Sequence, residues 1–174
     1  KFVPKFFDFL NVFYSKKNKS IRPYFGVYFR NFGGPNIRTK RLIKHFGNFL
    51  INPNIIYAQS FWSEIELRDA IKYSVKNQIP IIFNQNGLYY KGWFKGNYKA
   101  KNDMISLVQK KSKFIFFQSN FCKKSSIFFT KYKPKKSKIL YNSIPKKISK
   151  NRNVNTPKVF NILISGYFKN ENLY

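Results

Sequence analysis

Short, largely apolar runs alternate along the chain with stretches whose apolar residues have helical spacing. The runs lie at Tyr24–Phe29, Asn54–Gln59, Ile79–Phe83, Lys113–Phe117 and Ser137–Tyr141. Runs with little polar alternation are typical of strands buried on both faces, as in parallel sheets covered by helices. The pattern therefore predicts five strands of a mainly parallel sheet.

The stretches between these runs predict helices. One follows Gly33-Gly34 and ends near His45-Gly47, and the next begins at a capping box, Ser63 to Glu66, and ends near Asn77-Gln78. Two more are expected over about Lys101–Lys111 and over Asn120–Thr130. Strands and helices that alternate in this way predict the α/β class with a Rossmann-like, doubly wound, mainly parallel sheet.

The same pattern divides the chain into parts. The length of 174 residues suits one domain with a sizeable core. We expect an N-terminal segment at residues 1–21, a Rossmann-like domain at 22–145, a linker at 146–157 and the start of a second domain at 158–174. Because the sequence begins without Met and stops after a further strand-like run, it reads as a piece of a longer protein.

Polar residues and glycines gather where the predicted strands end. Gly33 and Gly34 follow the first strand and precede a helix, where bare backbone N–H groups can face an anion. A turn that needs positive φ is the competing explanation. Other strand ends carry Gln59, the amide cluster Asn84, Gln85 and Asn86, then Ser119 and Asn142. Amides that both donate and accept hydrogen bonds suit hydroxyl-rich ligands such as sugars, although a turn before Gly87 also explains Asn86.

The formal net charge of +28 suggests a polyanionic partner, either nucleic acid or an anionic membrane. A competing origin is a genome rich in A and T, because Lys, Asn, Ile, Phe and Tyr share such codons. Lysine greatly outnumbers arginine, the residue that binds phosphates and bases bidentately, so nucleic acid is the less favoured partner. The single cysteine excludes an internal disulfide framework.

Side-chain catalysis has little support in the sequence. Three of the six carboxylates lie at the start of one predicted helix, which does not suit a hydrolase pair. His45 is expected to be structural, and Cys122 to be a small core residue. We therefore assign no catalytic residue, no metal and no cofactor.

Five motifs in this order resemble the N-terminal domain of GT-B fold glycosyltransferases, specifically family 4-like enzymes. They are "FGGPNIRTKRL", "IPIIFNQNGLYY", "FIFFQSNFCKKS", "KILYNSIP" and "FNILISGYF", the last similar to the first strand and glycine of the donor-binding domain. The sequence departs from the family pattern where a histidine is frequent, at Gln85 or Asn86, and where a glycine usually follows Asn142.

The resemblance implies transfer of a sugar from a nucleotide-diphosphate donor to a saccharide or lipid-linked acceptor, usually with retention of configuration. It places Gly33, Gly34 and Gly166 against the donor. It places Asn84, Gln85, Asn86, Ser119 and Asn142 near the sugar or acceptor. The nucleotide sugar would be a substrate rather than a cofactor. The protein would be cytoplasmic, and contact with the inner face of the membrane is left open. This half of the enzyme would be inactive on its own. The alternative is a basic α/β module that binds nucleic acid or an anionic membrane without catalysis.

Overall fold

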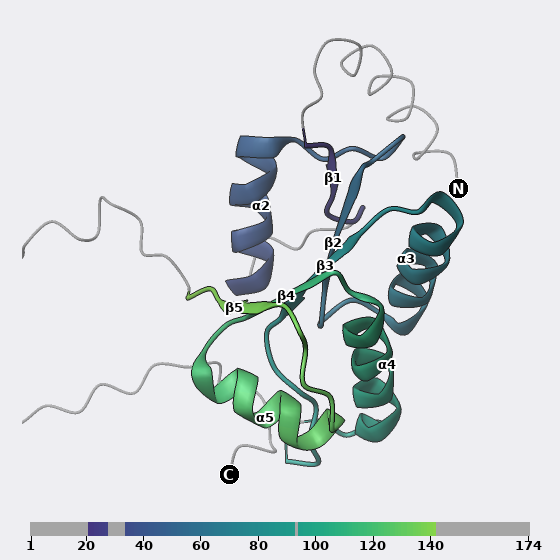
Figure 1. Cartoon of the computed structure of the whole chain (residues 1–174). Coiled ribbons are helices and arrows are strands. Elements are labelled where there is room, and N and C mark those ends of the chain that lie inside the picture. The colour runs from purple at the N-terminus through teal and green to yellow at the C-terminus, as the bar shows by residue number, and fades with distance from the viewer. Residues whose placement is uncertain (1–20, 28–33, 93, 142–174) are drawn as a thin grey trace, which may run out of the picture.

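The computed structural model, which describes residues 21–27, 34–92 and 94–141, contains a five-stranded parallel sheet of order β1-β2-β3-β4-β5 (Figure 1). Its strands are β1 (Pro23–Tyr24), β2 (Ile55–Gln59), β3 (Ile81–Gln85), β4 (Phe114–Phe117) and β5 (Ser137–Ile139). The connecting helices are α2 (Gly34–Phe46), α3 (Glu64–Asn77), α4 (Tyr98–Lys111) and α5 (Asn120–Thr130). This alternation confirms the predicted α/β class.

Helices cover both faces of the sheet. Side chains alternate along a strand, so Gln59 and its register partner Asn84 point to one face, while Ala58 and Phe83 point to the other. Gln59 and Asn84 hydrogen-bond to residues of α2. Ala58 and Phe83 pack with residues of α3, α4 and α5, and α2 lies across the sheet from α3 and α4 in Figure 1. The arrangement is that of a doubly wound, Rossmann-like domain.

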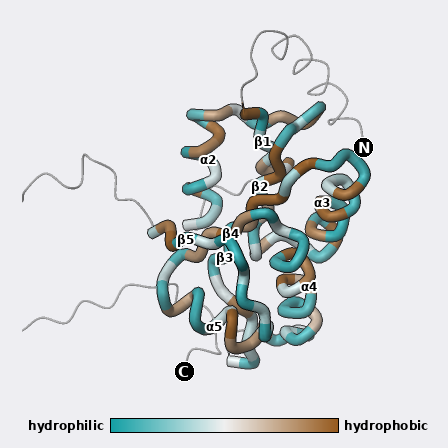
Figure 2. The backbone as a smooth tube through the Cα atoms, viewed as in Figure 1, coloured by the Kyte–Doolittle hydropathy of each residue, from teal (hydrophilic) through white to brown (hydrophobic). Residues whose placement is uncertain are grey.

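The main hydrophobic core lies between the sheet and α3, α4 and α5. Figure 2 shows hydrophobic residues along the strands and mixed hydrophobic and hydrophilic residues along the helices. The core contains Ile56, Ala58, Leu67, Ala70, Ile81, Phe83, Met104, Ile105, Val108, Ile115, Phe117 and Cys122. Burial of these apolar side chains fixes which face of each strand points inward.

The ends of α3 match the sequence prediction. The Ser63 side chain accepts a hydrogen bond from the Glu66 backbone N–H at 3.2 Å, and the Glu66 carboxylate accepts one from the Ser63 N–H at 2.7 Å. The helix ends at Gln78, which has a left-handed φ of 56°. The capping box therefore supplies partners for N–H groups that the helix itself leaves unpaired.

The first strand is shorter than predicted, because a side chain replaces a neighbouring strand. After Tyr24, the Phe25 N–H donates to the Asn48 side-chain oxygen at 2.9 Å, and the Asn48 amide donates to the Gly26 carbonyl at 2.8 Å. Gly26 has a φ of 103°, a conformation that strands do not adopt. The strand expected to run to Phe29 thus ends at Tyr24 in the described residues.

The third strand is displaced toward the C-terminus from its predicted range. Its pairing runs through Asn84, opposite Gln59, and Gln85, opposite Phe117, so these two amides belong to the strand rather than to the loop after it. α4 likewise starts before the predicted Lys101, because the Asn97 side chain accepts a hydrogen bond from the Ala100 N–H and caps the helix.

Several predicted segments lie outside the described residues. These are most of the N-terminal segment, the linker at 146–157 and the start of the second domain at 158–174. Among the helices that the structure describes, none combines the length and the apolar character that crossing a membrane requires.

Phe83, fully buried at the centre of the sheet, provides a test of the core. We expect Phe83→Ala to lower the free energy of unfolding by about 3–5 kcal/mol, because it removes a large buried ring and leaves a cavity. Urea denaturation followed by circular dichroism measures this loss. Phe121→Ala, at an 80% exposed position in the first turn of α5, is the control and should change the same quantity by less than about 0.5 kcal/mol. Equal losses in the two variants would contradict the assignment of the core.

Candidate ligand-binding site

The start of α2 lies at the edge of the sheet where the parallel strands end. Gly34 is the first residue of this helix, and its φ is not in the left-handed region. A Cβ built on Gly34 would meet no heavy atom within 4 Å. Positive φ and packing against non-adjacent described residues do not require glycine here, whereas the following Pro35, which crowds the Cβ of a preceding residue in the helical region, does favour it. Gly33 lies outside the described residues, so its competing explanations both stay open.

Arg38 connects α2 to the ends of two strands. Its Nη1 donates to the Asn84 Oδ1 at 3.1 Å, and its Nη2 donates to the Leu140 carbonyl just after β5 at 3.5 Å. The guanidinium also lies near the Tyr57 phenol: burial raises the pKa of Tyr57, and Arg38 opposes that shift. A cation is thus held one helical turn after Gly34, at the carboxyl edge of the sheet.

Thr39 fixes the orientation of the fully buried Gln59 amide. The Thr39 hydroxyl donates to the Pro35 carbonyl at 2.8 Å and accepts from the Gln59 Nε2 at 2.6 Å. The Gln59 Nε2 is paired in this way, whereas the Gln59 Oε1 is buried without a hydrogen-bond partner among the described residues. An unpaired buried acceptor costs about 1–3 kcal/mol, and because Gln59 is fully buried, pairing this oxygen with an added hydroxyl or N–H group requires the chain to open around it.

The predicted amide cluster is partly assembled around Asn84 and Asn86. The Asn84 Nδ2 donates to the Asn86 Oδ1 at 3.0 Å, and the Asn86 N–H donates to the Ser60 hydroxyl at 3.0 Å. The Asn86 Nδ2 is buried without a partner in the described part of the chain. One unpaired acceptor, on Gln59, and one unpaired donor, on Asn86, therefore stand at neighbouring strand ends.

Gln85 points to the opposite face of the sheet from Asn84. Its Oε1 accepts from the Gln109 Nε2 at 3.3 Å, and its own Nε2 donates to the Gly87 carbonyl. Gln109 also donates to the Ser126 hydroxyl at 2.6 Å. The Gln85 amide is thus engaged in a network that joins β3, α4 and α5, apart from the cluster of Asn84 and Asn86.

Of the remaining predicted site residues, one caps a helix and the others lie outside the described residues. The Ser119 hydroxyl accepts from the Cys122 N–H at 3.0 Å and so caps α5. Asn142 and Gly166 lie outside the described residues. Of the predicted site residues that are described, Asn84 and Asn86 lie together, and Asn84 is joined to the first turns of α2 through Arg38.

A groove of about 470 Å³ runs along α2 from its first residue, Gly34, to His45 in its last turn. Among the described residues, its lining includes Gly34, Arg38, Arg41, His45, Leu140 and Tyr141, and no carboxylate. The positive end of a 13-residue helix and two guanidinium groups favour an anion in this groove. The apolar side chains of Ile37, Leu42 and Leu140 complete the wall, as is usual for sites that bind organic ligands.

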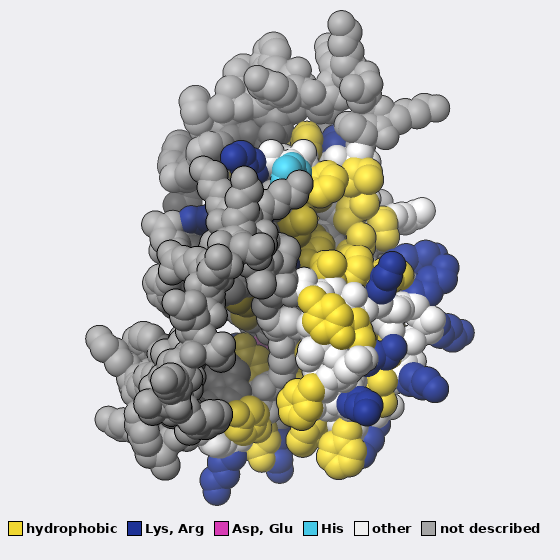
Figure 3. All heavy atoms as spheres, turned by 90° about the vertical axis from the view of Figure 1, so that its left-hand side faces the viewer, with side chains coloured by type: hydrophobic (Ala, Val, Ile, Leu, Met, Phe, Trp, Pro, Cys, Tyr) yellow, Lys and Arg dark blue, Asp and Glu magenta, His cyan; other side chains and the backbone are white. Residues whose placement is uncertain are grey.

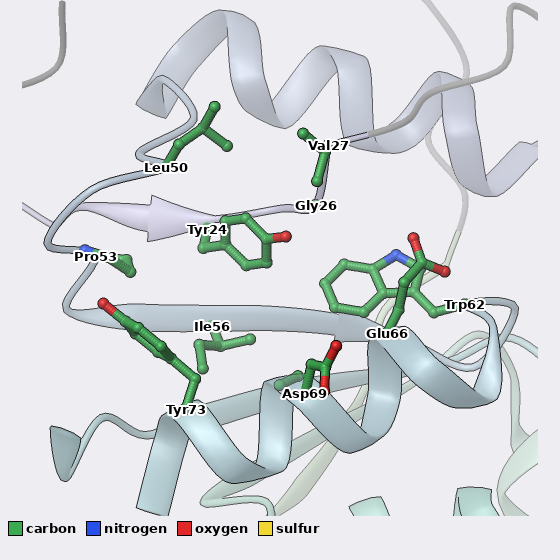
Figure 4. Close-up of a pocket in the computed structure, with 11 residues that line it drawn as sticks. Tyr24, Gly26, Val27, Leu50, Pro53, Ile56, Trp62, Glu66, Asp69 and Tyr73 are labelled. Atoms are coloured by element: carbon green, nitrogen blue, oxygen red, sulfur yellow. The ribbon is translucent and has the colours of Figure 1, made fainter. Parts of the chain in front are cut away.

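A second cavity, of about 360 Å³, lies at the β1 edge of the sheet (Figure 4). Tyr24 and Trp62 line it with ring centroids 6.0 Å apart, and Glu66 and Asp69 project from α3 beside them. Burial, followed by the two carboxylates, raises the pKa of Tyr24. The carboxylates disfavour an anion here, so a phosphate-bearing ligand fits the groove beside α2 better.

Among the described residues, few side chains near the groove could support acid–base or metal chemistry. The described carboxylates are Glu64, Glu66 and Asp69 on α3 and Asp103 on α4. Within residues 21–27, 34–92 and 94–141, no cluster of three or more His, Cys, Asp or Glu could hold a metal ion. The groove thus offers the backbone amides of the helix start and two guanidinium groups, which bind and orient anionic groups.

Two residues of this site, Arg38 and Thr39, were not anticipated from the sequence. Arg38 is four residues after Gly34, so helical spacing places the two on one side of α2, and that spacing was the available signal. Thr39 carried no such signal, because a polar residue in a helix is ordinarily solvent-exposed.

Comparisons of this chain with known protein families, with curated proteins and with solved structures give no match.

The rate at which the Cys122 thiol is alkylated tests whether a thiol nucleophile is available near the strand ends. The Cys122 thiol is buried and donates to the Gln85 carbonyl at 3.3 Å, and burial raises its pKa. At neutral pH, a smaller fraction of Cys122 is therefore in the thiolate form than for a free cysteine. The rate of Cys122 alkylation should rise as the pH rises. We expect iodoacetamide to modify the native chain at least roughly tenfold more slowly than the urea-unfolded chain. Equal rates in the two states would contradict this burial.

Proposed function

We propose that this chain is the N-terminal, Rossmann-like part of a glycosyltransferase that uses a nucleotide-diphosphate sugar. The observation that carries the proposal is Gly34. It begins α2 in a helical conformation, no non-adjacent described residue lies within 4 Å of the place where a Cβ would stand, and the groove beside it contains Arg38 and Arg41 and no carboxylate from the described part of the chain. A diphosphate can approach such a helix start closely, because no Cβ intervenes.

The polar strand ends supply the part of the site that suits a sugar or an acceptor hydroxyl. A hydroxyl group both donates and accepts hydrogen bonds, which matches the unpaired Gln59 Oε1 and Asn86 Nδ2. Arg38 links Asn84 to α2, so an anion at the helix start and a hydroxyl at the strand ends would belong to one ligand. In this proposal the chain contributes binding, orientation and stabilisation of the departing diphosphate rather than a side-chain base.

The resemblance of five motifs to family 4-like GT-B enzymes supports the same assignment, and it supplies the transfer reaction itself. Nucleic-acid binding is a weaker alternative, because most described aromatic residues of the strands are in the core or partly buried in the sheet. A saccharide or a lipid-linked saccharide is the proposed acceptor.

Gly34→Ala tests the proposal without disturbing the fold. We expect the free energy of unfolding to change by no more than about 1 kcal/mol, because the better helix propensity of alanine is offset by crowding between its Cβ and the following Pro35, and no other described residue lies within 4 Å. The affinity for a nucleoside diphosphate should fall by roughly tenfold or more, because a methyl group would stand where the phosphate approaches. Isothermal titration with UDP, GDP and their glucose conjugates measures the affinity, and urea denaturation measures the stability.

Lys44→Ala, in the last turn of the same helix, is the matched control. It removes a positive charge from α2 at the end far from Gly34 and should leave the affinity within about twofold. If Gly34→Ala binds nucleotides as strongly as the unaltered chain, the diphosphate does not bind at Gly34. Absence of binding by the unaltered chain to every nucleotide in the panel would count against a donor site on this half.

A further inference from the structure

The outer side of α5 is unusually hydrophobic for a solvent-exposed helix surface. Phe121 is 80% exposed, Phe128 65% and Phe129 61%. The side of the helix that faces the core carries Cys122 and Ser126 instead. Globular domains normally place Phe inside and Ser outside, so core packing does not account for this helix.

These aromatic residues share their surface with lysines. Phe121 and Phe128 are seven residues apart and therefore lie on one side of the helix, with Lys124 between them. The Lys131 Nζ stands 4.4 Å from the centre of the Phe128 ring. We call the set Phe121, Lys124, Phe128, Phe129 and Lys131 the α5 outer face.

The positive charge continues beyond the helix. Exposed lysines follow in the segment before β5, at Lys133, Lys135 and Lys136, and in β5 itself at Lys138. The sequence contains neither Asp nor Glu between Met104 and Asn170. In Figure 3, hydrophobic and basic side chains lie next to one another over the lower part of the molecule, at the height of α5 in Figure 1, and no described carboxylate is visible there.

We propose that the α5 outer face is a peripheral membrane contact for an anionic lipid bilayer. Phe121, Phe128 and Phe129 would enter the headgroup region, and Lys124 and Lys131 would lie against lipid phosphates. Exposed apolar rings flanked by cations are the combination that binds such a surface, because burial of the rings and attraction to the headgroups act together. The inference does not depend on the transferase proposal.

The chemistry of this face favours lipid over nucleic acid. Every cation on it and in the following segment is a lysine, and the sequence has no arginine between Arg68 and Arg152 to bind phosphates or bases bidentately. The Phe128 and Phe129 rings meet at 89°, so they do not form a flat platform on which successive bases could stack. Pairing with a second copy is opposed by the repulsion between chains of net charge +28.

Vesicle co-sedimentation of the full 174-residue chain tests the proposal. The vesicles are phosphatidylcholine alone and phosphatidylcholine with about 30% phosphatidylglycerol. We expect binding to the mixed vesicles and at least roughly tenfold weaker binding to the neutral ones. The double variant Phe121→Gln with Phe128→Gln should reduce the partition coefficient on mixed vesicles by roughly tenfold or more.

Two further variants separate hydrophobic insertion from charge and from a general effect of exposed apolar residues. Ile65→Gln with Val75→Gln removes two exposed apolar side chains from α3 and should leave binding within about twofold. Lys124→Gln with Lys131→Asn should weaken binding to the mixed vesicles and make it less sensitive to salt. Asn is chosen at position 131 because Lys131 has a left-handed φ of 53°. Circular dichroism and thermal unfolding confirm that each variant is folded.

Several outcomes would overturn the proposal. Equal binding to neutral and anionic vesicles would remove the role of charge, and undiminished binding by the double Phe variant would remove the role of α5. A defect of that variant in oligonucleotide binding, with vesicle binding intact, would assign the face to nucleic acid. Concentration-dependent dimerisation that the same variant abolishes, without vesicle binding by the unaltered chain, would assign it to a second copy.

Discussion

The hydrogen bond from Arg38 to Asn84 is the contact on which the arrangement of the candidate site depends. α2 follows a strand of two residues and could not be positioned by that strand alone. Arg38 joins the helix to β3 at 3.1 Å and reaches the chain after β5, so the helix start is held at the carboxyl edge of the sheet. Because the strands are parallel, the same edge collects the ends of β2, β3 and β4. A positive helix end and neutral amides thereby come together.

The two faces of the sheet differ in how their polar side chains are paired. The face under α3, α4 and α5 holds the apolar core, and its polar groups, such as Gln85 and Gln109, satisfy one another. The face under α2 holds Gln59, where one amide atom is paired and the other is not. Stability therefore rests mainly on the first face, and the proposed ligand site lies on the second. Such a division fits the general rule that open α/β sheets bind ligands beyond the carboxyl ends of their strands.

Local sequence signals predicted the elements well where the signal lay within a few residues. The capping box of Ser63 and Glu66 and the full range of α5 are examples. Prediction was poorer where distant residues decide the outcome. Asn48, more than twenty residues away, ends β1 by bonding to Phe25, and the neighbouring strands extend β3 to include Gln85. In the site, strand-end position indicated Asn84 and Asn86 correctly as neighbours, but it could not show that Gln85 faces the other way. Alternation along a strand settles that point only once the register is known.

The large positive charge has two possible origins, and the structure separates them in part. A biased genome can raise the number of Lys and Phe residues, but it does not determine which of them are exposed. Phe83 and Phe117 are fully buried, whereas Phe121 and Phe128 on α5 face outward. α3 also exposes apolar side chains, at Ile65 and Val75, yet it carries Glu64, Glu66 and Asp69, which balance the charges of Arg68, Lys72 and Lys76. Exposed apolar residues thus occur with carboxylates on one helix and with lysines alone on the other. Because only the second combination attracts an anionic surface, the position of the charge, rather than its total, supports a binding role for α5.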